Sequence, residues 1–255
     1  MTERFFVEPP ICSPTVKLIG DEFQHLVKVM RAQVGDEVTL FDGSGAEFTA
    51  RVSSLGKLAA ELEILARRPL DRELPFSLTL AVALPKGDRQ KWLIEKIVEL
   101  GVTCLIPLIT ERGVAQPVEN ALLRLRRGVM EASKQCGRNR LLEIGEPSDA
   151  LNFFRERPST ATCWLADPTG APLPRRETAA TNILAAIGPE GGFTPAEVAA
   201  ALAAGWSPIS LGPRILRVET AAIAIAAWAG LGDVVDLPSL GFPVIQSCAT
   251  PAAPK

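Results

Sequence analysis

Residues 187–194 read Ile-Gly-Pro-Glu-Gly-Gly-Phe-Thr, and residues 211–217 read Leu-Gly-Pro-Arg-Ile-Leu-Arg. Each block follows a short apolar run, residues 182–187 and 207–211, that is typical of a buried strand. Glycines at the end of a strand let backbone N–H and C=O groups approach a flat polar ligand without intervening side chains. The two blocks therefore predict one nucleotide-like ligand site built from two strand-end loops.

These blocks do not match the common nucleotide-binding motifs. A dinucleotide fingerprint needs G-x-G-x-x-G between the first strand and helix of a βαβ unit, whereas Gly188, Gly191 and Gly192 lie late in the chain. No lysine follows these glycines as it does in a P-loop. A nicotinamide-dependent dehydrogenase is therefore disfavoured. A plain turn before a capped helix stays open for Gly191 and Gly192 alone, but the second block weakens that alternative.

From residue 76 onward, apolar runs and amphipathic stretches alternate, which indicates an α/β fold with a parallel sheet covered on both faces. Strands are expected at residues 77–84, 104–109, 162–166, 183–187 and 207–211. Helices are expected at residues 88–101, 120–136, 194–205 and 219–231. Asp88 can cap the first helix, and Thr194 with Glu197 forms a capping box at the third.

The N-terminal third predicts a small β unit instead. Alternating residues 37–41 and 46–52 flank an Asp-Gly-Ser-Gly turn at 42–45, and a further run covers 58–65. We expect these strands to close as a barrel, with a short helix at 21–27 before them.

Composition shifts along the chain predict its domains. The charged, proline-bounded segment 67–75 is the best linker, so domains are expected at 1–72 and 73–238. Residues 239–255 are rich in Pro, Ser, Gly and Ala and are expected to form a poorly ordered tail. The helix at 219–231 is apolar almost all round, which predicts burial in a homodimer interface.

The composition is that of a folded globular protein, with 255 residues, a net charge of −2, 47% hydrophobic and 22% charged residues. No apolar run approaches the ~20 residues that cross a bilayer, and no signal-peptide core follows the N-terminus. The five cysteines are scattered, with neither a disulfide framework nor metal-ligand spacing. We therefore expect a cytoplasmic location, no membrane partner and no metal.

Residues 124–140 carry a basic cluster in this slightly acidic chain. It consists of Arg124, Arg126, Arg127, Lys134, Arg138 and Arg140, opposed only by Glu131. A negative net charge excludes only a globally basic nucleic-acid binder, because a local patch is sufficient to bind phosphates. A solvated helix face is the open alternative.

Both glycine blocks resemble the signature sequences of the RsmE family, the bacterial 16S rRNA (uracil-N3)-methyltransferases of the SPOUT superfamily. Further agreement occurs in the same order, in stretches 25–31, 35–36, 84–88, 95–101, 110–112 and 131–138. Together they cover about residues 4–235. Val218 departs from the pattern, since threonine is frequent there, and the tail past about residue 239 has no counterpart.

The resemblance implies a PUA-like RNA-binding β-barrel followed by a SPOUT-type domain with a C-terminal trefoil knot. The two glycine loops would then be the knot crossings that hold S-adenosylmethionine. In the homodimer, each cofactor would lie beside RNA-binding surface of the other subunit. The expected cofactor-binding residues are Gly188, Glu190, Gly191, Gly192, Leu211, Gly212, Ile215 and Leu216.

Methylation of uracil N3 requires the loss of the N3 proton, but no metal. A cation near O2 or O4 would stabilise the resulting anion, and a carboxylate could accept the proton. We predict Arg138 or Arg217 for the first role and Glu190 for the second. Glu190 could instead accept hydrogen bonds from its own turn. Glu219 is the second choice, since it can simply complement a helix dipole.

The expected RNA partner is 16S rRNA, free or within the 30S subunit. The predicted contacts to it are His25, Lys28, Arg31, Arg124, Arg127, Lys134 and Arg138. Two other functions stay open: a SPOUT enzyme that methylates tRNA, for example at a ribose 2′-hydroxyl, and a non-catalytic RNA-binding assembly factor. The intact glycine loops argue against the second. The target nucleotide and the proton acceptor also stay open.

Overall fold

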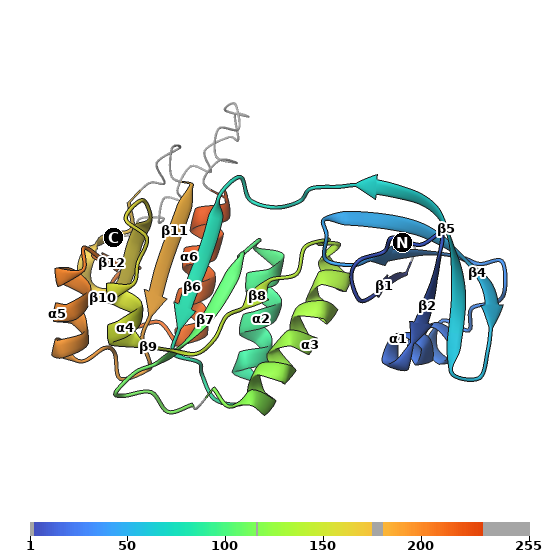
Figure 1. The fold of residues 1–255 in the computed structure, drawn as a ribbon. Coiled ribbons are helices and arrows are strands. Elements are labelled where there is room, and N and C mark those ends of the chain that lie inside the picture. Colours follow the sequence, from blue (N-terminus) through green and yellow to red (C-terminus); the bar gives the residue numbers. More distant parts are fainter. Residues whose placement is uncertain (1–2, 116, 175–180, 232–255) are drawn as a thin grey trace, which may run out of the picture.

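Two sheets of different connectivity organise the chain (Figure 1). The computed structural model describes residues 3–115, 117–174 and 181–231. Strands up to residue 69 form a five-stranded sheet, and strands from residue 77 onward form a seven-stranded one. The predicted boundary between residues 72 and 73 falls between these sheets. The predicted tail at 239–255 lies outside the described residues.

The N-terminal sheet has the order β1-β3-β4-β5-β2. Its strands are β1 Arg4–Phe6, β2 Thr15–Ile19, β3 Glu37–Phe41, β4 Ala46–Leu55 and β5 Ala59–Pro69. Among the described strands of this sheet, β1 and β3 pair in parallel and the other pairs are antiparallel. The sequence predicted β3, β4 and β5 but not the two end strands. β1 and β2 do not pair with each other within residues 3–115, so the ladder does not close through them into the expected barrel.

Alternation of apolar side chains builds the core of this β unit. Val38 and Leu40 on β3, and Phe48 and Val52 on β4, are almost fully buried, whereas Thr39 is half-buried and Thr49 and Arg51 are exposed. Leu26 closes the core from the segment after β2. That segment is α1 Gly20–Gln24, which continues into a π-helical turn at His25–Val29.

The larger sheet is parallel throughout. Its order is β12-β10-β11-β6-β7-β8, and β9 adds to β7. The strands are β6 Ser77–Val82, β7 Cys104–Ile109, β8 Glu143–Ile144, β9 Ser148–Asp149, β10 Thr162–Pro172, β11 Asn182–Ile187 and β12 Ser207–Ser210. The predicted strand at 77–84 thus ends two residues early. The expected parallel sheet is confirmed.

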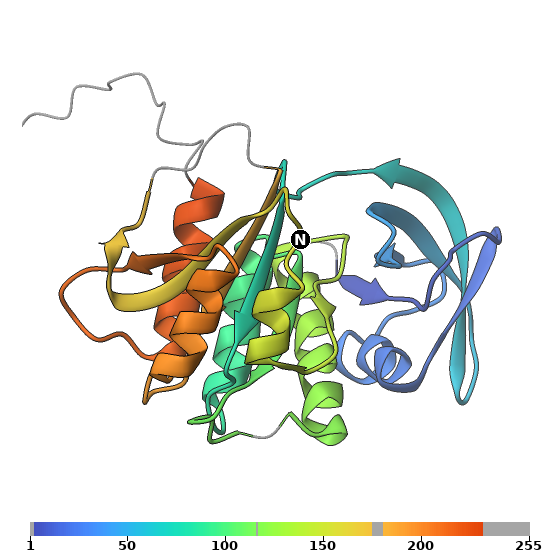
Figure 2. The same ribbon diagram turned by 60° about the vertical axis from the view of Figure 1, so that its left-hand side comes forward.

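Helices cover both faces of this sheet (Figures 1 and 2). α2 Arg89–Glu99, α3 Glu119–Cys136 and α6 Val218–Leu231 contribute to one core, and α4 Ala150–Arg155 and α5 Pro195–Ala203 to the other. Along β11, Ile183 and Ala185 face the first core, and Leu184 and Ala186 face the second. A strand buried on both faces is expected to be apolar at consecutive positions, as β11 is.

The helix ends correct one prediction and confirm another. Asp88 lies before α2, but its backbone is already helical and its side chain makes no capping hydrogen bond. At α5 the capping box is complete, because Thr194 Oγ1 accepts from the Glu197 N–H at 3.3 Å and Glu197 Oε2 accepts from the Thr194 N–H at 2.7 Å. The unpredicted α4 is capped by Asp149, whose carboxylate accepts two backbone N–H groups.

The apolar helix α6 finds much of its burial within its own chain. It packs against α2, β6 and β11, and Ala222, Ile225 and Ala226 are fully buried. Ile223 and Trp228 are only partly buried. The chain itself therefore buries part of the α6 surface that we expected a second subunit to cover. Homodimer formation stays a prediction.

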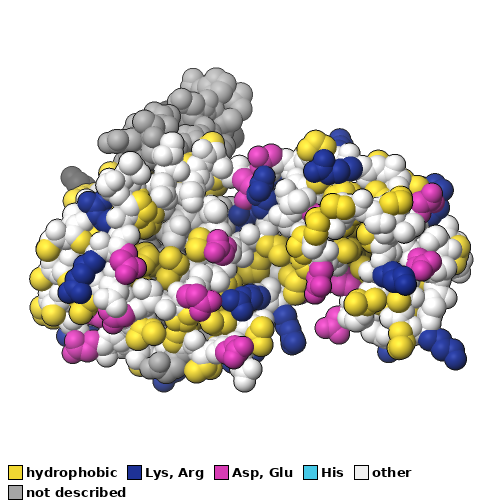
Figure 3. Space-filling model, in the orientation of Figure 1, with side chains coloured by type: hydrophobic (Ala, Val, Ile, Leu, Met, Phe, Trp, Pro, Cys, Tyr) yellow, Lys and Arg dark blue, Asp and Glu magenta, His cyan; other side chains and the backbone are white. Residues whose placement is uncertain are grey.

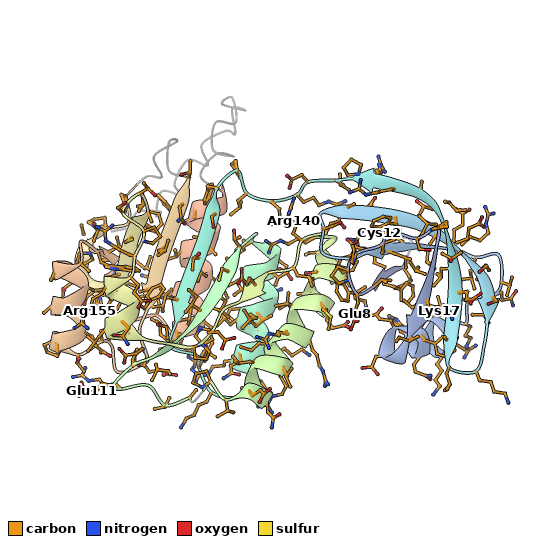
Figure 4. The ribbon with its side chains drawn as sticks, in the orientation of Figure 1. Glu8, Cys12, Lys17, Glu111, Arg140 and Arg155 are labelled. Atoms are coloured by element: carbon orange, nitrogen blue, oxygen red, sulfur yellow. The ribbon has the colours of Figure 1, made fainter. Side chains whose placement is uncertain are left out.

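The two sheet units are joined by specific polar contacts. Lys134 Nζ on α3 lies 2.8 Å from Glu22 Oε1 on α1, and Arg4 Nη2 donates to Asn139 Oδ1 at 2.6 Å. Arg140 lies at the same junction, beside the β unit (Figure 4). In the space-filling view, a notch opens below this junction, and charges of both signs are interspersed over the visible face (Figure 3).

Four cysteines in the described residues are free: Cys12, Cys104, Cys136 and Cys163. Burial, reinforced by the nearby Glu143 carboxylate, raises the pKa of Cys104 to about 11. None of the described helices combines the length and apolarity needed to span a bilayer.

Candidate functional site

A pocket of about 270 Å³ opens where the loops after β11 and β12 meet. Residues 188–192 line it from the first loop. Residues 211, 212 and 214–216 line it from the second. Every residue predicted to bind a cofactor therefore borders one pocket. The convergence follows from the parallel sheet, since parallel strands end at the same edge.

Glycine is required at two positions of the first loop. A Cβ on Gly188 would lie 3.0 Å from the ring of Phe193, which is itself buried. Gly192 has a φ of +68°, where an L side chain is strained, and its N–H closes a turn onto Pro189 O at 2.8 Å. Three of the five residues of this loop that line the pocket therefore carry no side chain.

A third wall, missed in the sequence, comes from β10. Ala166, Asp167 and Pro168 line the pocket, and the register of β10 against Ile209 shifts at this point. Asp167 Oδ1 accepts from both the backbone N–H and the hydroxyl of Thr169, at 2.7 Å each. The Asp-Pro-Thr-Gly turn sequence that follows the predicted strand 162–166 is a signal that could have revealed this wall.

Arg89, at the start of α2, reaches both Glu190 and Glu219. Its Nη2 lies 3.0 Å from Glu190 Oε1, and its Nη1 lies 3.7 Å from Glu219 Oε2. The Glu190 side chain is 41% exposed, whereas that of Glu219 is 4% exposed. Sequence reasoning named both carboxylates but not the arginine between them.

The loop after β7 holds the glycine loop from another side. Arg112 Nη1 donates to Gly191 O at 2.8 Å, and the Glu111 N–H donates to Glu197 Oε1 at 3.0 Å. Figure 4 places Glu111 at the lower edge of the α/β unit. Residues 110–112 belonged to the sequence resemblance, but nothing in the pattern indicated this contact.

Arg138 is buried and bonded within its own chain. Its guanidinium forms a bidentate ion pair with Glu73, with Nη2–Oε2 at 2.5 Å, and donates to Val98 O and Val102 O. The side chain is 5% exposed and does not line the pocket. All three guanidinium nitrogens of Arg138 bond to groups of its own chain, so its position lends no support to the predicted roles in RNA contact and catalysis, which stay predictions.

The other predicted catalytic cation, Arg217, is exposed and lies between the pocket residues Leu216 and Val218. It does not itself line the pocket. Its carbonyl accepts from the Ala221 N–H in the first turn of α6. Its side chain is therefore available beside the pocket rather than inside it.

The predicted RNA-contacting residues are divided between surface and interior. Lys28, Arg31, Arg124 and Arg127 are exposed. Lys134 is 10% exposed and pairs with Glu22 and Glu131. His25 is half-buried, with its ring 5.6 Å from that of Phe5. Lys134 and His25 thus contact residues of the same chain. The four exposed residues stay candidates for RNA binding.

Comparisons with known proteins agree with the two-part architecture. Residues 72–230 match a family described as the RNA methyltransferase domain, and residues 18–65 match the RNA methyltransferase PUA domain. The chain is 36% identical over 228 residues to ribosomal RNA small subunit methyltransferase E of Synechocystis, covering 87% of this chain and 75% of that protein. This chain belongs to the ribosomal RNA small subunit methyltransferase E family.

Other family members match over a similar share of this chain. The Bacillus subtilis ribosomal RNA small subunit methyltransferase E is 29% identical over 226 residues, covering 82% of this chain and 87% of that protein. A crystal structure of the Neisseria gonorrhoeae methyltransferase E bound to S-adenosyl methionine superposes with a TM-score of 0.82. It is 34% identical, covering 89% of this chain and 96% of the other.

Proposed function

We propose that this chain transfers the methyl group of S-adenosylmethionine to N3 of a uridine in 16S rRNA. Membership of the family makes it an S-adenosylmethionine-dependent rRNA methyltransferase. The observation that carries the proposal is the pocket formed by the two glycine loops. The choice of uracil N3 rests on the resemblance of those loops to the uracil-N3 enzymes.

The residues of the pocket fit an adenosyl group. Ile187, Leu211 and Leu216 supply apolar walls for the faces of a purine, and the glycine backbone supplies hydrogen-bonding groups at close range. When bound, S-adenosylmethionine supplies a methyl group on a positively charged sulfur. Two acidic residues, Glu190 and Asp167, and one cation, Arg214, line the pocket, and this acidic excess is compatible with that charge.

The chain's own residues must position the base and handle its proton. We propose that Glu190 accepts the N3 proton or orients the uracil, since its partly exposed carboxylate borders the pocket. Arg217, exposed beside the second loop, would stabilise negative charge on O2 or O4. The N3–C bond forms as the S–C bond breaks, and the N3 proton leaves to Glu190 or to water.

Substituting Arg217 separates catalysis from binding. Arg217→Ala is expected to lower kcat by about 100-fold, the lower range for loss of one electrostatic donor, with little change in cofactor Kd. Single-turnover methyl transfer and calorimetry measure the two quantities. An equal loss of both would make Arg217 a binding residue.

The proposed function is tested by incubating the purified chain with labelled S-adenosylmethionine and 16S rRNA, 30S subunits or tRNA. Mass spectrometry of the digested RNA should reveal 3-methyluridine in small-subunit RNA. Methylation of tRNA, or of a ribose hydroxyl, would contradict the substrate assignment. Cofactor binding without any transfer would favour a non-catalytic assembly factor.

Four finer features belong to the same proposal. The loops 188–192 and 211–216 would form the crossings of a trefoil knot, and α6 would contribute to a homodimer. We also propose that residues 1–72 and 73–238 are the two domains and that the enzyme acts in the cytoplasm. Sedimentation at micromolar concentration tests the dimer, and a monomer there would contradict it.

A further inference from the structure

We propose that Arg89 is a positioning residue that ties the first glycine loop to the start of α6 and so sets the geometry of the cofactor pocket. The proposal rests on S-adenosylmethionine being the ligand of that pocket. Arg89 does not line the pocket, so its action is through the residues that it holds.

The contacts of Arg89 span two walls of the pocket. Its Nη2 pairs with Glu190, which lies within the loop 188–192. Its Nη1 faces Glu219, which lies between the pocket residues Val218 and Ala221 at the start of α6. These walls are almost thirty residues apart in the chain, and one guanidinium contacts both. Arg89 is the first residue of α2, and α2 packs directly against α6.

The two ends of this bridge differ in their energetics. Glu219 is 4% exposed, and its Oε2 is buried without a hydrogen-bond partner in the described residues. A buried carboxylate that loses its counter-ion is strongly destabilising, so Arg89 balances this charge together with the positive N-terminal end of α6. Glu190 is partly exposed, and an exposed ion pair adds little stability by itself. At that end, Arg89 mainly fixes where the carboxylate lies.

Arg112 provides a matched comparison, because it contacts the same glycine loop as Arg89 does. It donates to Gly191 O from the loop after β7, but no contact of the described residues joins it to Glu219 or α6. Arg112 therefore holds one wall, whereas Arg89 holds two. Only Arg89 should show energetic coupling to Glu219.

The test is a double-mutant cycle with calorimetry of S-adenosylmethionine binding. The variants are R89Q, E219Q, R89Q/E219Q, R112Q and R112Q/E219Q, with R89K as the conservative replacement. R89Q should raise Kd about tenfold or more, since it leaves the Glu219 carboxylate unpaired. The Kd of R89Q/E219Q should lie within about threefold of the Kd of E219Q, because the double variant no longer carries an unpaired carboxylate at position 219. R89K should lie between wild type and R89Q, since a lysine keeps the charge without the fork that reaches both carboxylates.

The control cycle defines the opposite result. For R112Q/E219Q, the change in Kd should be the product of the two single changes. If the change in Kd for R89Q/E219Q is likewise the product of the two single changes, the proposal is overturned. If R89Q is too unstable to purify, recovery of folded protein in R89Q/E219Q supports the bridge, and no recovery overturns it. If the wild-type chain binds no S-adenosylmethionine, the proposed function is overturned. If R89Q binds S-adenosylmethionine with the same Kd as the wild type, only the proposed role of Arg89 is overturned.

Discussion

The glycine loops and the basic segment 124–140 are both clusters in the sequence, but only the glycine loops come together as a whole at one site. The loops after β11 and β12 meet at one pocket. The basic segment divides instead: Arg124 and Arg127 face solvent, while Lys134 and Arg138 are held by Glu22 and Glu73. The loops converge since parallel strands end at one edge of the sheet, whereas successive helical residues point in different directions.

The comparison teaches that a run of like charges is not yet a binding surface. Arg138 follows the end of α3, where Gly137 in the left-handed conformation turns the chain back toward the interior. Its bidentate pair with Glu73 joins residues 65 positions apart. The substitutions below test how far the two regions differ, beginning with the strongest expected effect.

Removing the interior arginine should be the most damaging change. Arg138→Ala leaves Glu73 without its partner and removes the arginine donor to Val102 O, so we expect a loss of about 3–5 kcal/mol in the free energy of unfolding. Urea denaturation measures this loss. In protein that remains folded, cofactor affinity should be close to that of wild type. Unchanged stability together with weaker RNA binding would instead restore Arg138 to the surface role.

A methyl group in the first glycine loop should affect both binding and stability. In Gly188→Ala, the new Cβ would lie 3.0 Å from the buried Phe193 ring, so we expect a destabilisation of about 1–3 kcal/mol and a clear rise in cofactor Kd. Gly191→Ala is the matched control, since its Cβ would meet only the Arg112 side chain at 3.4 Å. Equal effects of the two substitutions would contradict the steric argument at Gly188.

Lys134→Ala tests whether this lysine joins the two sheet units rather than binding RNA. Its loss removes the 2.8 Å pair with the partly buried Glu22, which should cost about 1–2 kcal/mol of stability. RNA affinity and its salt dependence should hardly change. A fall in the salt dependence of RNA binding, with stability intact, would place Lys134 on the RNA surface.

Substituting the exposed arginines should affect RNA binding rather than stability, the reverse of the result expected for Lys134. Arg124→Glu and Arg127→Glu should each change stability by less than about 0.5 kcal/mol. If they contact phosphates, each should weaken RNA binding and reduce the slope of log K against log salt by about 1. Titrations at several salt concentrations measure that slope. An unchanged slope would leave the two arginines as an ordinary solvated helix face.

Much of the architecture was predictable because its signals are local. The alternation of strands and helices from residue 76, the capping box at Thr194 and the turn at 42–45 each depend on neighbouring residues. Short elements escaped prediction: β1, β8 and β9 have only two or three residues, too few for a period to be recognised. The expected barrel was predicted without β1 and β2, which form the two ends of the N-terminal sheet and which the sequence pattern did not reveal.

The sequence by itself determined where the pocket's two glycine walls lie, because apolar strands followed by glycines in a parallel sheet must bring their loops to a common edge. Only the tertiary structure decided that β10 adds a third wall, that Arg89 contacts two carboxylates from distant segments, and that Arg138 is buried. These features depend on which side chains far apart in the chain come within a few ångströms of each other. That pairing is a property of the packed fold, and no single stretch of residues carries it.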